Sequence, residues 1–204
     1  MGEQANIPRS WSDEPVHIAH YDATWPERFE RERAMLQEAI GEWVAGGVHH
    51  IGSTSVPGLD AKPIIDILVG VGDLELPPEC FARLAALDYV HAPYRIGEMH
   101  WFAKPDPLHR THHLHLVAVD SPRFGDSLLF RDQLRARPEV ARDYVALKHH
   151  LAEVFKHDRD SYTQAKGEFI CSTVRQAQEQ GRKPALRPAS APAHAPAPAH
   201  ALSA

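Results

Sequence analysis

The sequence is poor in cysteine and has no long apolar run. Its two cysteines, Cys80 and Cys171, lack the short spacing that marks a zinc site or a disulfide framework. No stretch is long and apolar enough to span a bilayer, and residues 1–12 lack the basic start and apolar run of a signal peptide. We therefore expect a cytoplasmic protein with no membrane partner.

An excess of positive charge is also missing. The 204 residues carry a formal net charge of −5, which argues against a broad basic surface for nucleic acid but leaves room for a local basic pocket. Hydrophobic residues make up 43% of the chain and charged residues 24%, as in an ordinary globular protein. The 15 histidines stand out, and their positions must separate metal or phosphate ligands from surface residues.

The two ends of the chain differ from its middle. Residues 1–14 are polar without periodicity, and we expect a loose arm there. Residues 183–204 are rich in proline and alanine and almost free of large apolar side chains, which predicts a disordered tail. Residues 15–182 are left as one α/β domain, with a mixed sheet followed by a C-terminal helical part.

Local patterns predict the elements of this domain. Thr24 and Glu27 fit a capping box at the start of a first helix. Asp126 is placed to cap a helix that runs to Ala136. Other helices are predicted at 78–87, from 138 and at 160–181. Strands are predicted at 16–20, 48–51, 64–71, 89–92, 100–104 and 113–119.

The segment HIGSTSVPGLDAKPIIDILV, residues 50–69, carries the clearest chemical pattern. A predicted strand leads into Gly52, Ser53 and Thr54, whose small size, N–H groups and hydroxyls suit phosphate oxygens. Asp66 then interrupts an apolar strand, where a carboxylate needs a cation, a metal or several donors. Lys62 can contact phosphate or pair with Asp66. A turn and a loop-capping aspartate explain each feature singly; their combination favours a phosphate and metal site.

This segment resembles the signature of the GrpB family, also called UPF0157. The resemblance continues in YDATWPERFERE, HHLHLV, FRDQLRARPEVARDYVALKHHLAEVF and YTQAKGEFI, and it covers residues 16–174. It implies a nucleotidyltransferase fold, that is, a mixed sheet with flanking helices. It also implies a domain that occurs fused to dephospho-CoA kinase.

The carboxylates depart from the nucleotidyltransferase pattern. Such enzymes place two carboxylates one residue apart on a strand after the Gly-Ser, with a third on a later strand, to hold two Mg²⁺ ions. Asp66 fills one of these positions, but its partner position holds Leu68 or Ile64. No carboxylate precedes Asp120 on the later strand. The departure argues against ordinary transfer with two Mg²⁺ ions.

Two histidines offer a different metal site. His113 and His115 are two residues apart on a predicted strand and therefore point to the same face. Together with Asp66 they would form a two-histidine, one-carboxylate set, which suits Fe²⁺, Mn²⁺ or Zn²⁺ better than Mg²⁺. They can instead be hydrogen-bonded sheet residues, or bind substrate phosphate without a metal.

The helical half offers cations for phosphate. Tyr144 and Lys148, and likewise Tyr162 and Lys166, are four residues apart and share a helix face. With Arg131 they are candidate phosphate ligands. The alternative is a set of solvated helix faces with snorkelling lysines.

Three functions are compatible with these patterns. The first is a transferase of the nucleotidyltransferase type, which binds a nucleotide or other phosphorylated small molecule, with Asp66 and Ser53 in catalysis. Its metal would be Mg²⁺ or Mn²⁺, with Zn²⁺ or Fe²⁺ as further candidates. The second is a binding module that has lost catalysis and assists a protein partner. Metal-dependent hydrolysis or ligation in the same pocket is a third reading.

Overall fold

The computed structural model describes residues 15–185, which contain a five-stranded sheet with helices on both faces. The predictions for the arm at 1–14 and for most of the tail at 183–204 lie outside the described residues. The strand order in the sheet is β1-β2-β5-β4-β3. The strands are β1 Val44–Ile51, β2 Ile65–Val71, β3 Val90–Ala92, β4 His100–Lys104 and β5 His112–Ala118.

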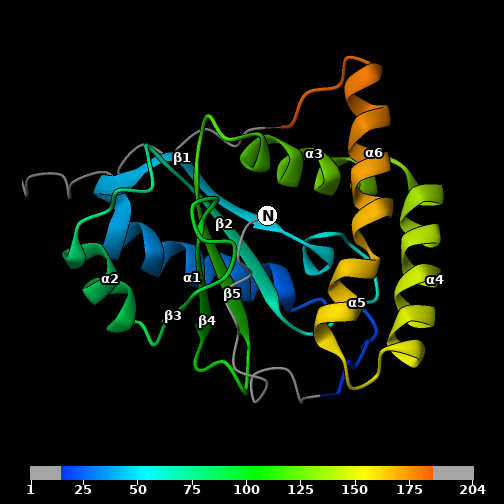
Figure 1. Cartoon of the computed structure of the whole chain (residues 1–204), viewed down its shortest axis with the longest axis horizontal. Helices are drawn as coiled ribbons and strands as arrows, with labels where there is room; N and C mark the ends of the chain where they lie inside the picture. The colour runs from blue at the N-terminus through cyan, green and yellow to red at the C-terminus, as the bar shows by residue number, and fades with distance from the viewer. Residues whose placement is uncertain (1–14, 186–204) are drawn as a thin grey trace, which may run out of the picture.

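Six α-helices and two short 3₁₀ turns surround the described sheet (Figure 1). In Figure 1, α4, α5 and α6 lie together to the right of the sheet, whereas α2 lies to its left. The helices are α1 Trp25–Ile40, α2 Pro78–Ala85, α3 Pro122–Ala136, α4 Pro138–Val154, α5 Arg159–Ala165 and α6 Gly167–Glu179. The 3₁₀ turns are η2 Gly41–Trp43 and η3 Ser53–Ser55. The expected mixed α/β fold with a helical C-terminal part is therefore confirmed.

The sheet is mixed because one of its pairings is parallel. β2 runs parallel to β5, whereas the β1–β2, β4–β5 and β3–β4 pairs are antiparallel. Asp66 is the register partner of Ile51 on one side and of His113 on the other. Register partners point to the same face of a sheet, so the pairing fixes which side chains meet.

Apolar side chains fill both faces of the sheet. One face packs against α1 and α2 through residues such as Phe29, Ile67 and Leu84. On the other face, Phe124 of α3 packs over the backbone of Gly46 and Gly70. A Cβ added at either glycine would collide with the Phe124 ring, so the missing side chains let α3 approach the sheet closely.

Several predicted boundaries are wrong for local reasons. The Thr24 side chain makes no capping bond; instead Oδ1 of Asp22 accepts from the Thr24 N–H. Ser121 caps α3, so Asp126 lies inside that helix. The predicted strand at 16–20 is reduced to one bridge, between Ala19 and Ala61. The final helix is divided into α5 and α6.

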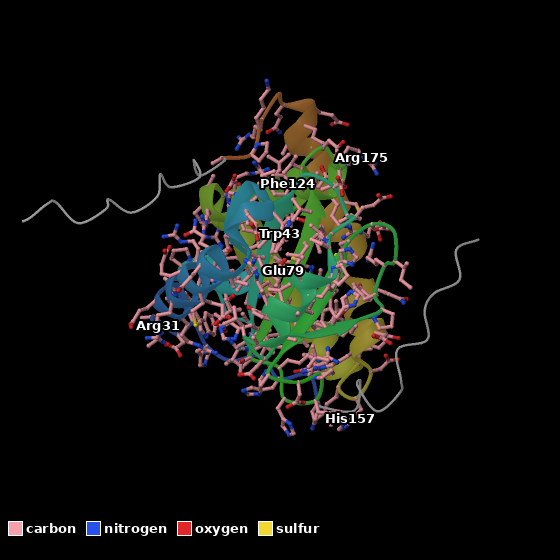
Figure 2. All side chains as sticks on the ribbon, turned by 90° about the vertical axis from the view of Figure 1, so that its left-hand side faces the viewer. Arg31, Trp43, Glu79, Phe124, His157 and Arg175 are labelled. Carbon is pink, nitrogen blue, oxygen red and sulfur yellow. The ribbon has the colours of Figure 1, made fainter. Side chains whose placement is uncertain are left out.

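Figure 2 shows the side of the molecule on which α2 lies. Trp43 and Glu79 lie near the middle of this view, where the Arg83 guanidinium lies over the Trp43 ring and pairs with Glu79. His157 and Arg175 lie toward its two ends. Among the described residues, no helix has the length and apolar character needed to cross a membrane.

Candidate functional site

The parallel pairing of β2 and β5 brings Asp66, His113 and His115 together as the sequence pattern predicted. Nδ1 of His113 lies 2.9 Å from Oδ1 of Asp66, at hydrogen-bond distance. Nε2 of His115 lies 3.8 Å from the same oxygen. One candidate ligand atom from each residue lies within 4.8 Å of the other two, and we call this set the Asp-His-His group.

The three side chains of the Asp-His-His group are mostly buried but remain partly exposed to solvent. The side chain of Asp66 is 31% exposed, that of His113 14% and that of His115 20%. Burial alone would raise the pKa of Asp66, but His113 and His115 outweigh it and hold that pKa well below its usual range. Burial lowers the pKa of His113 to about 4, against the opposite effect of Asp66. At neutral pH the group therefore combines an ionised carboxylate with a neutral His113 imidazole.

The donor set fits a divalent metal ion. Nε2 of His115 is buried without a hydrogen-bond partner in the described part of the chain. Ligand atoms bound at roughly 2.1 Å are separated by about 3.0 Å at right angles and by about 3.4 Å in a tetrahedron. The separations of 2.9 and 3.8 Å from Oδ1 of Asp66 lie close to these values. To share one ion with Asp66, the His115 imidazole would have to move closer to the carboxylate.

Gly52 and Ser53 border the Asp-His-His group, as the Gly-Ser pattern predicted. Gly52 follows β1 with a φ of 68°, and a Cβ built on it would collide with Oδ2 of Asp66. The glycine therefore lets the backbone lie against the carboxylate. Ser53 opens η3, and it acts on the Tyr144 hydroxyl of α4, whose pKa burial raises and Ser53 lowers.

Three lysines from separate segments lie on the same side of the site, and we call Lys62, Lys148 and Lys166 the lysine cluster. The ammonium groups of Lys62 and Lys166 both lie over the ring of Tyr162, at 5.0 and 4.1 Å from its centroid. Nζ of Lys148 lies 5.1 Å from the centroid of Tyr144 and donates to the backbone carbonyl of Asp60. The paired tyrosines and lysines predicted on the two helices thus face the loop that contains Lys62.

Burial and mutual repulsion weaken the charges of the lysine cluster. Burial, followed by the charges of Lys166 and Arg159, lowers the pKa of Lys62 to about 7. Burial and Lys166 lower the pKa of Lys148 to about 7. Burial lowers the pKa of Lys166 to about 8, with Asp66 acting in the opposite direction. An anion bound here would restore the charge of these lysines.

Two arginines near the site were missed by the sequence interpretation. The Arg159 side chain is buried at the start of α5, and its charge acts on Lys62. Arg110 also acts on Lys62, and its guanidinium lies 5.5 Å from the ring of Trp101, which in turn packs against His113. Neither arginine belongs to a motif, because each reaches the site through tertiary contacts.

Two predicted phosphate ligands are engaged elsewhere. Nη1 of Arg131 donates to the carbonyl of His50 at 3.4 Å, and its Nε donates to Oδ1 of Asp132 at 2.8 Å. The Thr54 hydroxyl is buried and donates to the carbonyl of Ile64, while Nε2 of His50 lies 3.0 Å from it. Both side chains bind backbone carbonyls at the two ends of the loop between β1 and β2, so their phosphate-binding roles remain sequence predictions.

The positions expected for further carboxylates are apolar and buried. Leu68, two residues after Asp66, is 1% exposed, and Ile64, two residues before it, is 5% exposed. Asp120 lies beyond the end of β5 and is exposed. The departure from the two-metal pattern therefore appears in three dimensions as well as in sequence.

Comparison with known proteins gives a consistent result. The family described as GrpB protein matches residues 15–176. The chain is 37% identical to the glutamate-rich protein GrpB of Alkalihalophilus pseudofirmus, over 76% of this chain and 91% of the relative. It is 35% identical to the UPF0157 protein YqkA of Bacillus subtilis over 83% of this chain, but it spans only 50% of that relative.

A solved structure and two longer relatives extend this picture. The crystal structure of the conserved protein GrpB from Enterococcus faecalis superposes with a TM-score of 0.73 at 33% identity, covering 81% of this chain and 99% of that one. Two mycobacterial relatives named dephospho-CoA kinase match at 28% and 27% identity over less than half of their length. On the strength of the family match, the close relatives and the shared structure, the chain belongs to the GrpB family.

Proposed function

We propose that this protein is a metal-dependent transferase of the nucleotidyltransferase type that acts on a nucleotide or another phosphorylated small molecule. One observation carries the proposal: the Asp-His-His group and the lysine cluster act on each other although they come from five separate segments. The charge of Asp66 raises the pKa of both Lys62 and Lys166 against the effect of burial, so these two lysines lie within electrostatic reach of the candidate metal ligand.

The residues divide into three roles. The Asp-His-His group would hold the divalent ion, which would polarise a phosphoryl oxygen when bound. The lysine cluster would offset the charge of the substrate phosphates and orient them. Gly52 and Ser53 would border the reacting group, with Tyr144 of α4 near the Ser53 hydroxyl. Metal-dependent hydrolysis or ligation would use the same residues and differ in the acceptor.

One observation favours a second function, that of a nucleotide-binding accessory module. Buried Leu68 and Ile64 occupy the strand positions where a second carboxylate would stand beside Asp66, and two-metal transfer depends on such a group. The relatives named dephospho-CoA kinase are about twice as long as the matched region, so a GrpB domain can share a chain with another activity. Such a module would bind the phosphorylated ligand without turning it over.

A thermal-shift matrix tests the proposal. The purified full chain is mixed with ATP, GTP, CTP, UTP, CoA precursors or inorganic polyphosphate, each with Mg²⁺, Mn²⁺, Zn²⁺ or Fe²⁺. Specific binding raises the unfolding temperature by mass action. We expect a metal-dependent rise with one class of ligand that is lost in Asp66→Asn. Asp120→Asn, an exposed carboxylate after the neighbouring strand, is the matched control and should keep the rise.

Product analysis then separates the two functions. Turnover of the stabilising ligand, detected by chromatography, supports the enzyme. Binding without turnover in the presence of every metal and a panel of acceptors supports the accessory module. A folded protein that shows no shift with any ligand contradicts both.

A further inference from the structure

The candidate metal site has an unusual charge environment for a metal site. Its ligand set supplies one negative charge, from Asp66, and the rest of the set is imidazole. Lys62 and Lys166 lie within electrostatic reach of that carboxylate. The cations Arg159 and Lys148 act in turn on Lys62 or Lys166. With pKa values of about 7 and 8, Lys62 and Lys166 are partly charged near neutral pH, and to that extent they offset the attraction that the carboxylate exerts on a metal ion.

Contacts with neighbouring residues hold the lysine ammonium groups in place. Both ammonium groups lie over the same Tyr162 ring, and this ring is only 1% exposed. Lys148 is held to the backbone carbonyl of Asp60 and is 2% exposed, so it has little freedom to move away. Water screens such charges less than it screens charges on an open surface. An incoming cation would meet this repulsion unless an anion balanced it.

We propose that one transition-metal ion occupies the Asp-His-His group tightly only when an anion is bound at Lys62 and Lys166. The proposal rests on the proposed function, because it concerns the same site, and it adds that metal and phosphate bind cooperatively. An anion between the lysines would remove the repulsion on the metal. By linkage, the metal raises the affinity for the anion by the same factor.

The ligand types decide the class of metal. Mg²⁺ prefers an octahedron of oxygen ligands and is held poorly by two imidazoles. Mn²⁺, Fe²⁺, Co²⁺ and Zn²⁺ bind imidazole nitrogen well, and two histidines with one carboxylate leave open positions for further ligands. Nε2 of His115 lies 3.8 Å from Oδ1 of Asp66, so the two atoms are near enough to bind the same ion if they approach each other slightly.

Cobalt titration with and without sulfate tests the coupling. Co²⁺ reports imidazole ligation through its visible ligand-field absorption, and sulfate is a tetrahedral dianion that stands for phosphate without precipitating cobalt. The full chain, stripped of metal, is titrated with Co²⁺ in sulfate or in chloride of equal ionic strength. We expect sulfate to raise the apparent Co²⁺ affinity about tenfold, within the usual range of coupling between sites. The reciprocal titration of sulfate, with and without Co²⁺, should give the same factor.

Variants assign the coupling to particular residues. Lys62→Gln combined with Lys166→Gln should bind Co²⁺ about tenfold more tightly than the wild type in chloride, and sulfate should no longer matter. This gain of affinity is a result that misfolding does not produce. Lys156→Gln, an exposed lysine after α4, should behave as the wild type. His115→Ala should lose the cobalt absorption and keep sulfate binding.

The outcomes separate this inference from the proposed function. Equal Co²⁺ affinity in sulfate and chloride overturns the coupling but leaves the metal site in place. Tight cobalt binding in chloride that the double lysine variant does not improve also overturns it. Sulfate binding without any cobalt absorption overturns both the coupling and the metal-dependent part of the proposed function. A tenfold gain with sulfate in both reciprocal titrations supports the inference even if the double variant fails to fold.

Discussion

His113 and Asp66 are register partners on parallel strands, and Nδ1 of His113 lies 2.9 Å from Oδ1 of Asp66. The two residues are 47 positions apart in the chain. Their contact therefore depends on the crossover that brings β5 beside β2. A hydrogen bond between a buried imidazole and a carboxylate fixes the orientation of both side chains.

Gly52 should be intolerant of a side chain because of this carboxylate. Gly52→Ala would place a Cβ against Oδ2 of Asp66 and force a backbone conformation that suits glycine. We expect a loss of about 1–3 kcal/mol in stability from the backbone alone, and a loss of Co²⁺ binding. The matched control is Gly58→Ala, with a φ of 76° but no atom within 4 Å of its Cβ. Denaturant unfolding and cobalt titration compare the two; equal behaviour would contradict a specific role for Gly52.

The sequence predicted the core of the site because short-range periodicity carries the necessary geometry. A spacing of two on a strand puts His113 and His115 on one face, and a spacing of four on a helix puts Tyr162 and Lys166 on one face. Arg159 could not be found in this way, because its approach to Lys62 depends on where α5 begins. Gly167 stands at the break between α5 and α6, but a single glycine inside a helical pattern is often tolerated, so it does not by itself predict a helix end.

Capping was predicted less well because several polar residues compete at each helix start. Thr24 and Glu27 have the spacing of a capping box, but Asp22 binds the Thr24 N–H instead. At α3, Ser121 accepts from the Arg123 N–H, and this places the helix start before Asp126. Sequence spacing alone does not show which of two nearby acceptors wins.

Acid should destabilise the protein through buried neutral histidines. Burial lowers the pKa of both His50 and His112 to about 4, from 6.5 in the unfolded chain. The folded state binds fewer protons than the unfolded state in this range, so stability is fully present above pH 6.5 and is lost as pH falls toward 4. His50→Gln should flatten this loss by at most about 3 kcal/mol. Urea unfolding between pH 4 and 7 measures it.

The control for this pH dependence is His150→Gln, because His150 is exposed on α4. Its stability curve should follow the wild type at every pH. An unchanged acid slope in His50→Gln would show that other groups carry the loss.

Tyr162 should support the lysine cluster through its ring. The ammonium groups of Lys62 and Lys166 both lie over this ring, and such contacts contribute about 0.5–2 kcal/mol each. Tyr162→Leu should weaken sulfate binding by about 2- to 30-fold for each of the two contacts that it removes, as measured by calorimetry. Tyr162→Phe keeps the ring and should stay within about twofold of the wild type. An equal loss in both variants would assign the effect to the hydroxyl.

Arg131 distinguishes a phosphate ligand from a structural support. Its guanidinium donates to the carbonyl of His50 and to Asp132, and it is 6% exposed. Arg131→Gln should therefore cost about 1–3 kcal/mol of stability, because it leaves buried acceptors without a donor. Sulfate affinity, measured by calorimetry below the unfolding temperature, should remain unchanged. Lys166→Gln is the comparison and should lose sulfate affinity, because its ammonium lies over the Tyr162 ring beside Lys62. A fall in sulfate affinity for Arg131→Gln with little loss of stability would instead establish it as an anion ligand, as the sequence pattern indicates.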